Sequence, residues 1–345
     1  MNNYMVMTVR GPVSAQAIGI TLPHEHILID QSPSVIADHH TAGSYESTLS
    51  PELIPLVKRD PRAVRDNLIM QDVTLATREL GYFFEQGGGT VIDMTNIGMG
   101  RNPEGLKEIS HVTGLHIITS TGFYVEDMHP EFVREAGIEK LADLMIEELT
   151  EGINSTTIKA GMIGEIGTST ILTDQEEKVL RAAARAQRET DAPMNIHLAT
   201  MKGREGPKVL NILEKEGVNL NRVVLSHMDF VCDDFSHLSK LARRGVFLEF
   251  DSFGANFIVE NQNFIPPNDE EKVKALKHLI DDGFKEQLLI SQDVCFKIQL
   301  KAFGGPGYDH IVRHVLPFMD KEGIDNETIR TIMINNPQRL LQMPV

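Results

Sequence analysis

Two histidines stand two residues apart at the end of an apolar, strand-like run, in the segment Ile18-Gly19-Ile20-Thr21-Leu22-Pro23-His24-Glu25-His26. Because strand side chains alternate between two faces, His24 and His26 should project the same way and could converge on one divalent cation. A single pair of this kind is weak evidence in a chain with 13 histidines. The pair becomes informative because similar runs recur further along the chain.

Four later strand-like runs also lead to a potential metal ligand. Three of them end in one, namely residues 193–197 at His197, residues 222–227 at His227 and residues 287–293 at Asp293, and a fourth, residues 158–163, leads into Gly164-Glu165. Taken singly, Glu165 could be an ordinary loop carboxylate and Asp293 a helix cap. Six potential ligands at the same place in a repeat favour one shared site.

The elements that must position these residues follow a repeating strand and helix order, which predicts a parallel sheet. We expect eight strands, near residues 18–22, 90–94, 115–120, 158–163, 193–197, 222–227, 245–250 and 287–292. Eight such units close a (β/α)8 TIM barrel, here a single domain over residues 1–345. An open doubly wound sheet is the alternative, but only a barrel brings the carboxyl ends of all the strands to one rim.

Several helix boundaries can be read directly. Residues 173–176 and 268–271 have the form of capping boxes, Asp60-Pro61 resembles a helix start, and Gly87 and Gly283 mark helix ends. Residues 30–61 form a long segment rich in polar residues and proline. We expect this segment to lie over or beside the mouth of the barrel.

Four histidines and two carboxylates suit two divalent transition ions, zinc first and cobalt, manganese, nickel or iron as alternatives. Glu165 is the candidate for the bridge between them. Two ions sharing a water would lower its pKa toward neutrality, so a bridging hydroxide becomes available as a nucleophile. Asp293 would bind one ion and act as the acid and base of the reaction. The pattern therefore predicts a hydrolase.

Composition narrows the class of protein. The 345 residues carry 33 Lys and Arg against 49 Asp and Glu, a net charge of −16, which disfavours nucleic acid and anionic membranes as partners. Two cysteines point to a reducing compartment, and no apolar run approaches the length of a membrane span. We expect a cytoplasmic protein without a membrane segment.

With these residues in place, the chain resembles the phosphotriesterase-like family of the amidohydrolase superfamily, from Thr8 to Leu341. The resemblance is carried by residues 21–26, 159–169, 225–229, 289–293 and 336–341. It implies a barrel with two metal ions, in which His24, His26 and Asp293 hold the more buried ion and His197 and His227 the more exposed one. It also implies a homodimer.

The sequence departs from the best-known family members at two positions. Those members bridge the ions with a carbamylated lysine, whereas this chain offers Glu165, as in the phosphotriesterase homology branch. Lys159 stands nearby but is interpreted as structural or facing solvent. Ser252 falls where the family has a histidine that shuttles protons.

The family contains lactonases as well as phosphotriesterases. The residues on the loops beyond the ligands are therefore used to predict the substrate. Four basic residues and a tyrosine on two of these loops could bind a phosphate or carboxylate group of the substrate: Lys202, Arg204, Lys297, Lys301 and Tyr308. The basic residues could equally serve the solubility of the surface. The lack of tryptophan and the 6% aromatic share argue against an apolar pocket. We expect a lactonase acting on a small polar sugar lactone, with or without a phosphate group. The alternatives are a phosphoesterase or general esterase on the same centre, and a metal-binding protein without turnover.

Overall fold

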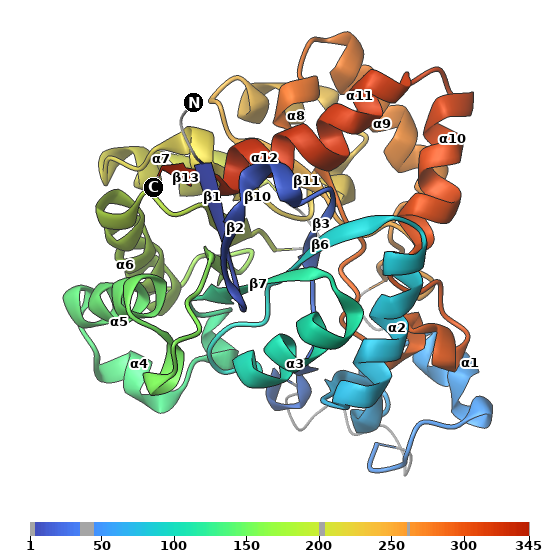
Figure 1. Cartoon of the computed structure of the whole chain (residues 1–345), viewed down its shortest axis with the longest axis horizontal. Coiled ribbons are helices and arrows are strands. Elements are labelled where there is room, and N and C mark those ends of the chain that lie inside the picture. The colour runs from blue at the N-terminus through green and yellow to red at the C-terminus, as the bar shows by residue number, and fades with distance from the viewer. Residues whose placement is uncertain (1–3, 35–44, 200–203, 261–262, 345) are drawn as a thin grey trace.

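The central feature of the fold is an eight-stranded parallel sheet that curls into a nearly closed barrel surrounded by helices. The computed structural model describes residues 4–34, 45–199, 204–260 and 263–344 (Figure 1). Hydrogen bonding joins the strands in the order β12-β11-β10-β9-β8-β7-β6-β3. Their bounds are β3 Ile20–Glu25, β6 Gly88–Asp93, β7 His116–Thr121, β8 Met162–Gly167, β9 Met194–His197, β10 Val223–Leu225, β11 Phe247–Phe250 and β12 Leu288–Ile290.

Helices follow the strands and cover the outside of the barrel. The longer ones are α2 Val73–Glu85, α3 Pro103–Thr113, α5 Ile138–Thr150, α6 Asp174–Thr190, α7 Gly206–Lys215, α8 Phe235–Ala242 and α9 Asp269–Asp281. Shorter helices are α1 Ile54–Val57, α4 Glu131–Glu135, α10 Leu316–Lys321, α11 Asn326–Arg330 and α12 Asn336–Leu341. The predicted single-domain (β/α)8 barrel is therefore confirmed.

The first and last described strands lie side by side and flank the barrel (Figure 1). β1 (Tyr4–Thr8) pairs antiparallel with both β2 (Gly11–Ser14) and β13 (Met343–Pro344). Val6 from β1 and Leu340 from α12 pack in one apolar cluster with barrel residues such as Val224 and Phe247. The hairpin and the last helix thus close the end of the barrel opposite to the strand carboxyl ends. A further short pair, β4 (Ile29–Asp30) with β5 (Ile69–Met70), lies outside the barrel sheet.

The alternation of strand side chains explains why the barrel interior changes from apolar to polar along its axis. In β11, Phe247 belongs to the inner apolar cluster, and Leu248 packs in the larger cluster that includes the helices. Two positions after Phe247, Glu249 again faces inward and bonds to His24. In β12 and beyond, Leu289 and then Ser291 repeat this change. The side chains that face the barrel interior therefore become polar near the carboxyl ends of the strands.

The seam between the first and last barrel strands is joined by a buried carboxylate. Glu25 accepts hydrogen bonds from the backbone N–H groups of Gln292 and Val294, both at 2.9 Å, and from the hydroxyl of Ser291 at 2.8 Å. Backbone bonds add to the seam, since Asp293 N donates to His24 O at 3.2 Å. The seam thus brings the segment after β12 next to the two histidines of β3.

The predicted helix signals are confirmed with one exception. Capping boxes begin α6 at Thr173 and α9 at Asn268, and Gly87 and Gly283 adopt positive φ after helices α2 and α9. The expected helix start at Asp60-Pro61 is wrong. Residues 61–64 form turns, a 3₁₀ turn follows at Arg65–Leu68, and helix α2 begins only after its cap Asp72.

The fourth strand begins four residues later than the sequence indicated. Residues 158–161 are instead the connection from α5, held by the bonds from Ile153 N to Ile158 O at 2.8 Å and from Ala160 N to Glu148 O at 2.9 Å. Strand β8 therefore contains Glu165 within it, and the carboxylate starts from a rigid element rather than a loop.

Candidate metal centre

The structure brings the six predicted ligands together at the carboxyl end of the barrel. His24, Glu165 and His197 belong to strands β3, β8 and β9, whereas the other three lie just beyond a strand end: His26, His227 and Asp293. The residues that the sequence placed at successive strand ends therefore form one cluster in space. All six face the same pocket or lie directly beneath it.

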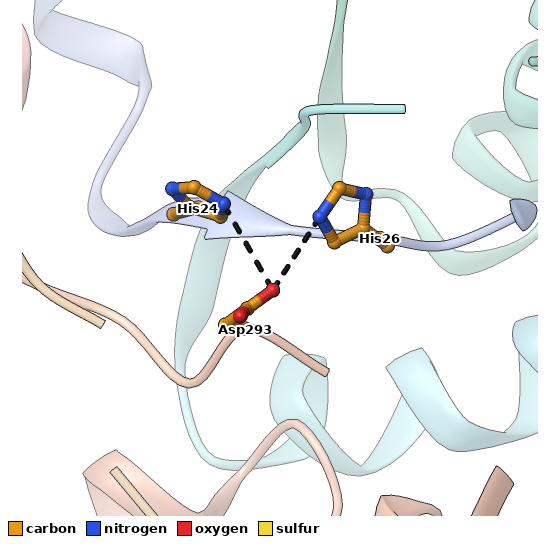
Figure 2. A group of neighbouring side chains, drawn as sticks. All are labelled: His24, His26 and Asp293. Carbon is orange, nitrogen blue, oxygen red and sulfur yellow. Dashed lines mark ion pairs between the residues drawn. The ribbon is translucent and has the colours of Figure 1, made fainter. Parts of the chain in front are cut away.

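One part of the cluster consists of His24, His26 and Asp293, which point toward one another from the two sides of the seam (Figure 2). The Nε2 atoms of His24 and His26 lie 3.9 and 3.4 Å from Oδ1 of Asp293. Both imidazoles are buried, and the Asp293 side chain is 22% exposed. This arrangement can hold a cation while leaving one carboxylate in contact with the pocket.

Glu165 occupies the middle of the cluster. Its Oε2 lies 3.6 Å from His24 Nε2, 3.1 Å from His197 Nδ1 and 3.7 Å from His227 Nε2. Its Oε1 lies 3.5 Å from His26 Nε2. One carboxylate thus faces all four histidines, which is the position required of a ligand shared by two ions.

Each imidazole is oriented by a partner on its other ring nitrogen. His24 Nδ1 is 2.9 Å from Glu249 and His227 Nδ1 is 2.8 Å from Asp251. In the other two imidazoles, His26 Nδ1 is 3.0 Å from the Thr95 hydroxyl and His197 Nε2 is 3.2 Å from the Tyr124 hydroxyl. Such partners fix the ring orientation of metal-binding histidines and direct the free nitrogen at the ion.

The residues present fit divalent ions on two grounds. His24 Nε2 is completely buried and has no hydrogen-bond partner among the described residues, which a bound metal ion would explain. Two overlapping groups also place their ligand atoms within 4.8 Å of one another, His24 with His26 and Asp293, and His24 with Glu165 and His227. Imidazole nitrogen with carboxylate oxygen is a donor set typical of transition ions.

The electrostatics of the cluster favour positive charge. Burial opposes the charged form of His24, but the neighbouring Glu165 and the hydrogen bond to Glu249 raise its pKa to about 10. Burial likewise opposes the charge on Glu165, yet the histidines around it, His197 first, lower its pKa well below the usual range. The acidic side chains of the cluster thus favour positive charge beside them, which a bound cation would supply.

Comparison with known proteins decides the family. The model of the phosphotriesterase family matches residues 4–341. The chain belongs to the phosphotriesterase family. This is a family of metal-dependent hydrolases, and the protein is accordingly a hydrolytic enzyme. Among the described residues, every helix is too short or too polar to cross a lipid bilayer.

Relatives within the family match over nearly the whole chain. An N-acetyltaurine hydrolase of Tetraodon nigroviridis is 34% identical over 343 residues, 97% of each chain. A resiniferatoxin-binding protein from Rhodobacter sphaeroides has a TM-score of 0.94 at 35% identity, covering 98% of this chain and 94% of that one. The phosphotriesterase homology protein from Escherichia coli, complexed with phosphate in its active site, has a TM-score of 0.79 at 29% identity, covering 94% and 99%.

Two further positions can be placed relative to the family pattern. Ser252, which the resemblance placed at the position of the family's histidine, donates its backbone N–H to Asp229 at 2.9 Å, and its hydroxyl bonds to the same carboxylate. Lys159 donates its ammonium to the carbonyl of Thr150 at the end of α5, away from the cluster. The carboxylate that lies between the histidines is that of Glu165.

The pocket above the ligands is walled mainly by apolar side chains. Those described are Met99, Phe230, Phe257, Val259, Phe264 and Phe296. Phe230 lies between a ligand and the outer wall, with its ring centre 6.0 Å from that of His227 and 5.0 Å from that of Phe264. The expectation that few aromatic residues imply a polar pocket is wrong, because the chain gathers its phenylalanines from three loops onto one wall.

Of the five residues expected to bind substrate, the four that the structure describes do not line this pocket. Lys202 lies outside the described residues. Arg204 pairs with Asp234 at 2.6 Å, Lys297 with Asp66 at 2.6 Å and Lys301 with Asp309 at 2.6 Å, and none of the three lines the pocket. Tyr308 is buried and donates its hydroxyl to the carbonyl of His26 at 2.8 Å, so it supports a ligand from behind.

Three polar residues of the pocket wall escaped the sequence analysis: Gln31, Arg62 and Tyr124. Gln31 follows the short strand β4 and Arg62 lies in a turn before β5, so neither of them follows a strand of the barrel. Tyr124 follows β7, the one barrel strand between β6 and β8, and the sequence offered no ligand there. The only available signal was the expected position of residues 30–61 beside the mouth, which Pro61 and Gln31 now confirm for the described part of that segment.

Proposed function

We propose that this chain hydrolyses a carboxylic amide or ester at a centre of two divalent ions held by His24, His26, Glu165, His197, His227 and Asp293. The observation that carries the proposal is the position of Glu165, which lies between 3.1 and 3.7 Å from a ring nitrogen of all four histidines. The partnerless Nε2 of His24 supports it independently. Zinc suits the donor set best, with cobalt, manganese, nickel or iron as alternatives.

When bound, the ions would polarise the substrate carbonyl and lower the pKa of a water molecule toward neutrality. Asp293 takes the proton as the new carbon–oxygen bond forms. It then returns a proton to the leaving nitrogen or oxygen as the old bond breaks, which yields a carboxylic acid and an amine or alcohol. Burial alone would raise the pKa of Asp293, but the hydrogen bond from His26 and the nearby histidine charges lower it. The carboxylate is therefore ionised at neutral pH, which is the form that a general base requires.

The substrate that we favour is a short N-acyl amine with an acidic group at its far end. A relative named N-acetyltaurine hydrolase shares 34% of its residues with this chain over almost the full length. The pocket offers an apolar wall for the hydrocarbon part and one arginine, Arg62. An N-acylated amino sulfonate or amino acid has the matching combination of groups.

A sugar lactone is the second candidate. Its ester carbonyl would meet the same ligands and the same Asp293, and its tetrahedral intermediate carries the same charge as that of an amide. The phenylalanine-rich wall provides few partners for sugar hydroxyls, which favours the amide over a sugar lactone. Phosphate esters form the third arm of the test, since the related protein from Escherichia coli holds phosphate in its active site.

A substrate panel tests the proposal. The metal-loaded protein is offered N-acetyltaurine, N-acetyl amino acids, sugar lactones with and without phosphate, and a phosphotriester. We expect the acidic N-acetyl compounds to have the highest kcat/KM, and Asp293→Asn to lower kcat at least ~100-fold. Hydrolysis of none of these compounds above the Asp293→Asn background would refute the proposal. The cytoplasmic location and the homodimer stay predictions, to be checked by fractionation and by light scattering.

A further inference from the structure

We propose that Arg62 determines the specificity of the pocket by binding an anionic group at the end of the substrate remote from the reacting carbonyl. The inference rests on the proposed function for the identity of that carbonyl. It concerns a residue that no sequence motif marked.

Arg62 is the sole arginine or lysine among the described residues that line the pocket. Every other cation that the sequence placed near the rim and that the structure describes has an acidic partner at 2.6 Å, as in the pair Lys297 and Asp66. Within the described part of the chain, the guanidinium of Arg62 has no carboxylate within ion-pair distance. Arg62 is partly exposed, so an anionic ligand in the pocket can reach a cation that no described carboxylate already neutralises.

The backbone of Arg62 is held rigidly. Its N–H donates to the side chain of Asp60 at 3.0 Å, and the N–H of Ala63 donates to the carbonyl of Asp60 at 3.0 Å. Pro61 precedes it, and the carbonyl of Pro61 accepts from the buried amide of Asn67 at 2.9 Å. The side chain therefore starts from a fixed point at the pocket wall.

Two other loops of the rim fasten this turn in place. The loop after β11 donates from Ile258 N to Lys58 O at 2.8 Å and from Glu260 N to Arg59 O at 3.0 Å. The loop after β12 donates from Ile298 N to the side chain of Asn67 at 3.0 Å. These same loops carry Phe257 and Phe296 of the apolar wall. The hydrogen bonds between the loops therefore hold Arg62 in a fixed position relative to that wall.

The chemistry of the occupant follows from this arrangement. A guanidinium presents a planar fork of donors that matches a carboxylate, sulfonate or phosphate and forms two charge-assisted hydrogen bonds with it. The phenylalanines beside it accommodate a hydrocarbon linker. Because Arg62 and the ligand Glu165 line the same pocket, one molecule can contact both. The anionic end binds before and after the reaction, so Arg62 should act mainly on KM.

A matched pair of substrates tests the inference. One is N-acetyltaurine, and the other is the neutral analogue in which a methyl sulfone replaces the sulfonate. For the metal-loaded protein, we expect Arg62→Met to lower kcat/KM for the sulfonate about 10- to 100-fold, chiefly through KM, and to change the sulfone far less. Arg62→Lys should restore part of the loss. Arg65→Met, an exposed arginine three residues away and outside the pocket, is the control and should leave both values within about twofold.

A binding measurement separates this inference from the proposed function. The ketone 4-oxopentane-1-sulfonate has no amide bond to hydrolyse, and calorimetry can measure its affinity for the loaded protein. Weaker binding to Arg62→Met than to the wild type, by about tenfold or more, supports the role of Arg62 even if no amide is hydrolysed. Equal affinity of the two proteins, or an equal loss of kcat/KM on sulfonate and sulfone, would overturn it.

Discussion

The Nδ1 atom of His24 lies 2.9 Å from Oε2 of Glu249, and both side chains are fully buried in the barrel interior. Glu249 also accepts from the amide of Asn195 at 2.8 Å and from the hydroxyl of Ser226 at 3.0 Å. Because these bonds fix the carboxylate, they fix the imidazole as well. The free Nε2 of His24 is thereby directed toward Glu165 and Asp293.

Glu249→Gln should weaken metal binding without removing any ligand. The neutral amide is a poorer acceptor for His24 Nδ1, and loss of such a partner typically costs 10- to 100-fold in metal affinity. Competition against a fluorescent chelator measures the effect, with Glu147→Gln on the exposed face of α5 as the control. Unchanged affinity in Glu249→Gln would show that His24 needs no support from Glu249.

Glu25→Gln should destabilise the seam of the barrel. The carboxylate accepts from Ser291, Gln292 and Val294, and a glutamine would turn an N–H₂ group toward one of these donors. One buried backbone N–H then loses its acceptor, at a cost of about 1–3 kcal/mol in the free energy of unfolding. Urea unfolding followed by circular dichroism measures this, again against Glu147→Gln. A midpoint equal to that of the wild type would contradict the role given to Glu25.

Asp269 gives the protein a pH-dependent contribution to stability. It accepts from His310 Nε2 at 2.7 Å and from Gly254 N at 3.0 Å, which fastens the loop that carries the aromatic wall. Burial opposes its charge, but the bond from His310 and the charge of Lys272 lower its pKa below the usual value. The native state therefore binds the proton less readily than the unfolded chain. The stabilisation is fully present above the unfolded pKa of about 3.9 and is lost as pH falls below it.

Urea titrations of the wild type and Asp269→Asn at pH 5.5 and pH 3.5 test this account. We expect the wild type to be more stable at pH 5.5 and the difference to shrink at pH 3.5, where the wild-type carboxylate loses its advantage. A difference that is the same at both pH values would show that Asp269 acts by packing alone.

The sequence predicted the clustering of the six residues well because each of them follows from a local pattern. His197 and His227 close apolar runs whose alternation is visible in the letters, and a barrel then brings all strand ends to one rim. The fourth strand was placed too early because Ile158 and Ala160 resemble strand residues in the sequence. In the structure, Ile158 forms a backbone hydrogen bond with the turn after α5, and Ala160 forms one with α5 itself. Apolar letters alone do not distinguish a strand from a buried connection.

The pocket could not be predicted because its residues share no local pattern. Phe230, Phe264 and Phe296 come from three separate loops, and only the closed barrel makes them neighbours. The ion-pair partners of the cations could not be predicted for a similar reason. Lys297 is neutralised by Asp66, which lies 231 residues away in the chain, whereas Arg62 is left without such a partner among the described residues. Which cation stays available for a ligand is decided by tertiary contacts.

Metal stoichiometry tests the central claim most directly. The purified protein is stripped with a chelator, reloaded with zinc, desalted and analysed by inductively coupled plasma mass spectrometry, next to Glu165→Ala and the control Glu147→Gln. We predict about two equivalents of metal per chain for the wild type and the control, and one or fewer for Glu165→Ala, with a lower Tm for the stripped wild type than for the loaded one. A wild type that retains less than one equivalent, or a Glu165→Ala variant that retains two, would contradict a centre in which Glu165 is shared by two ions.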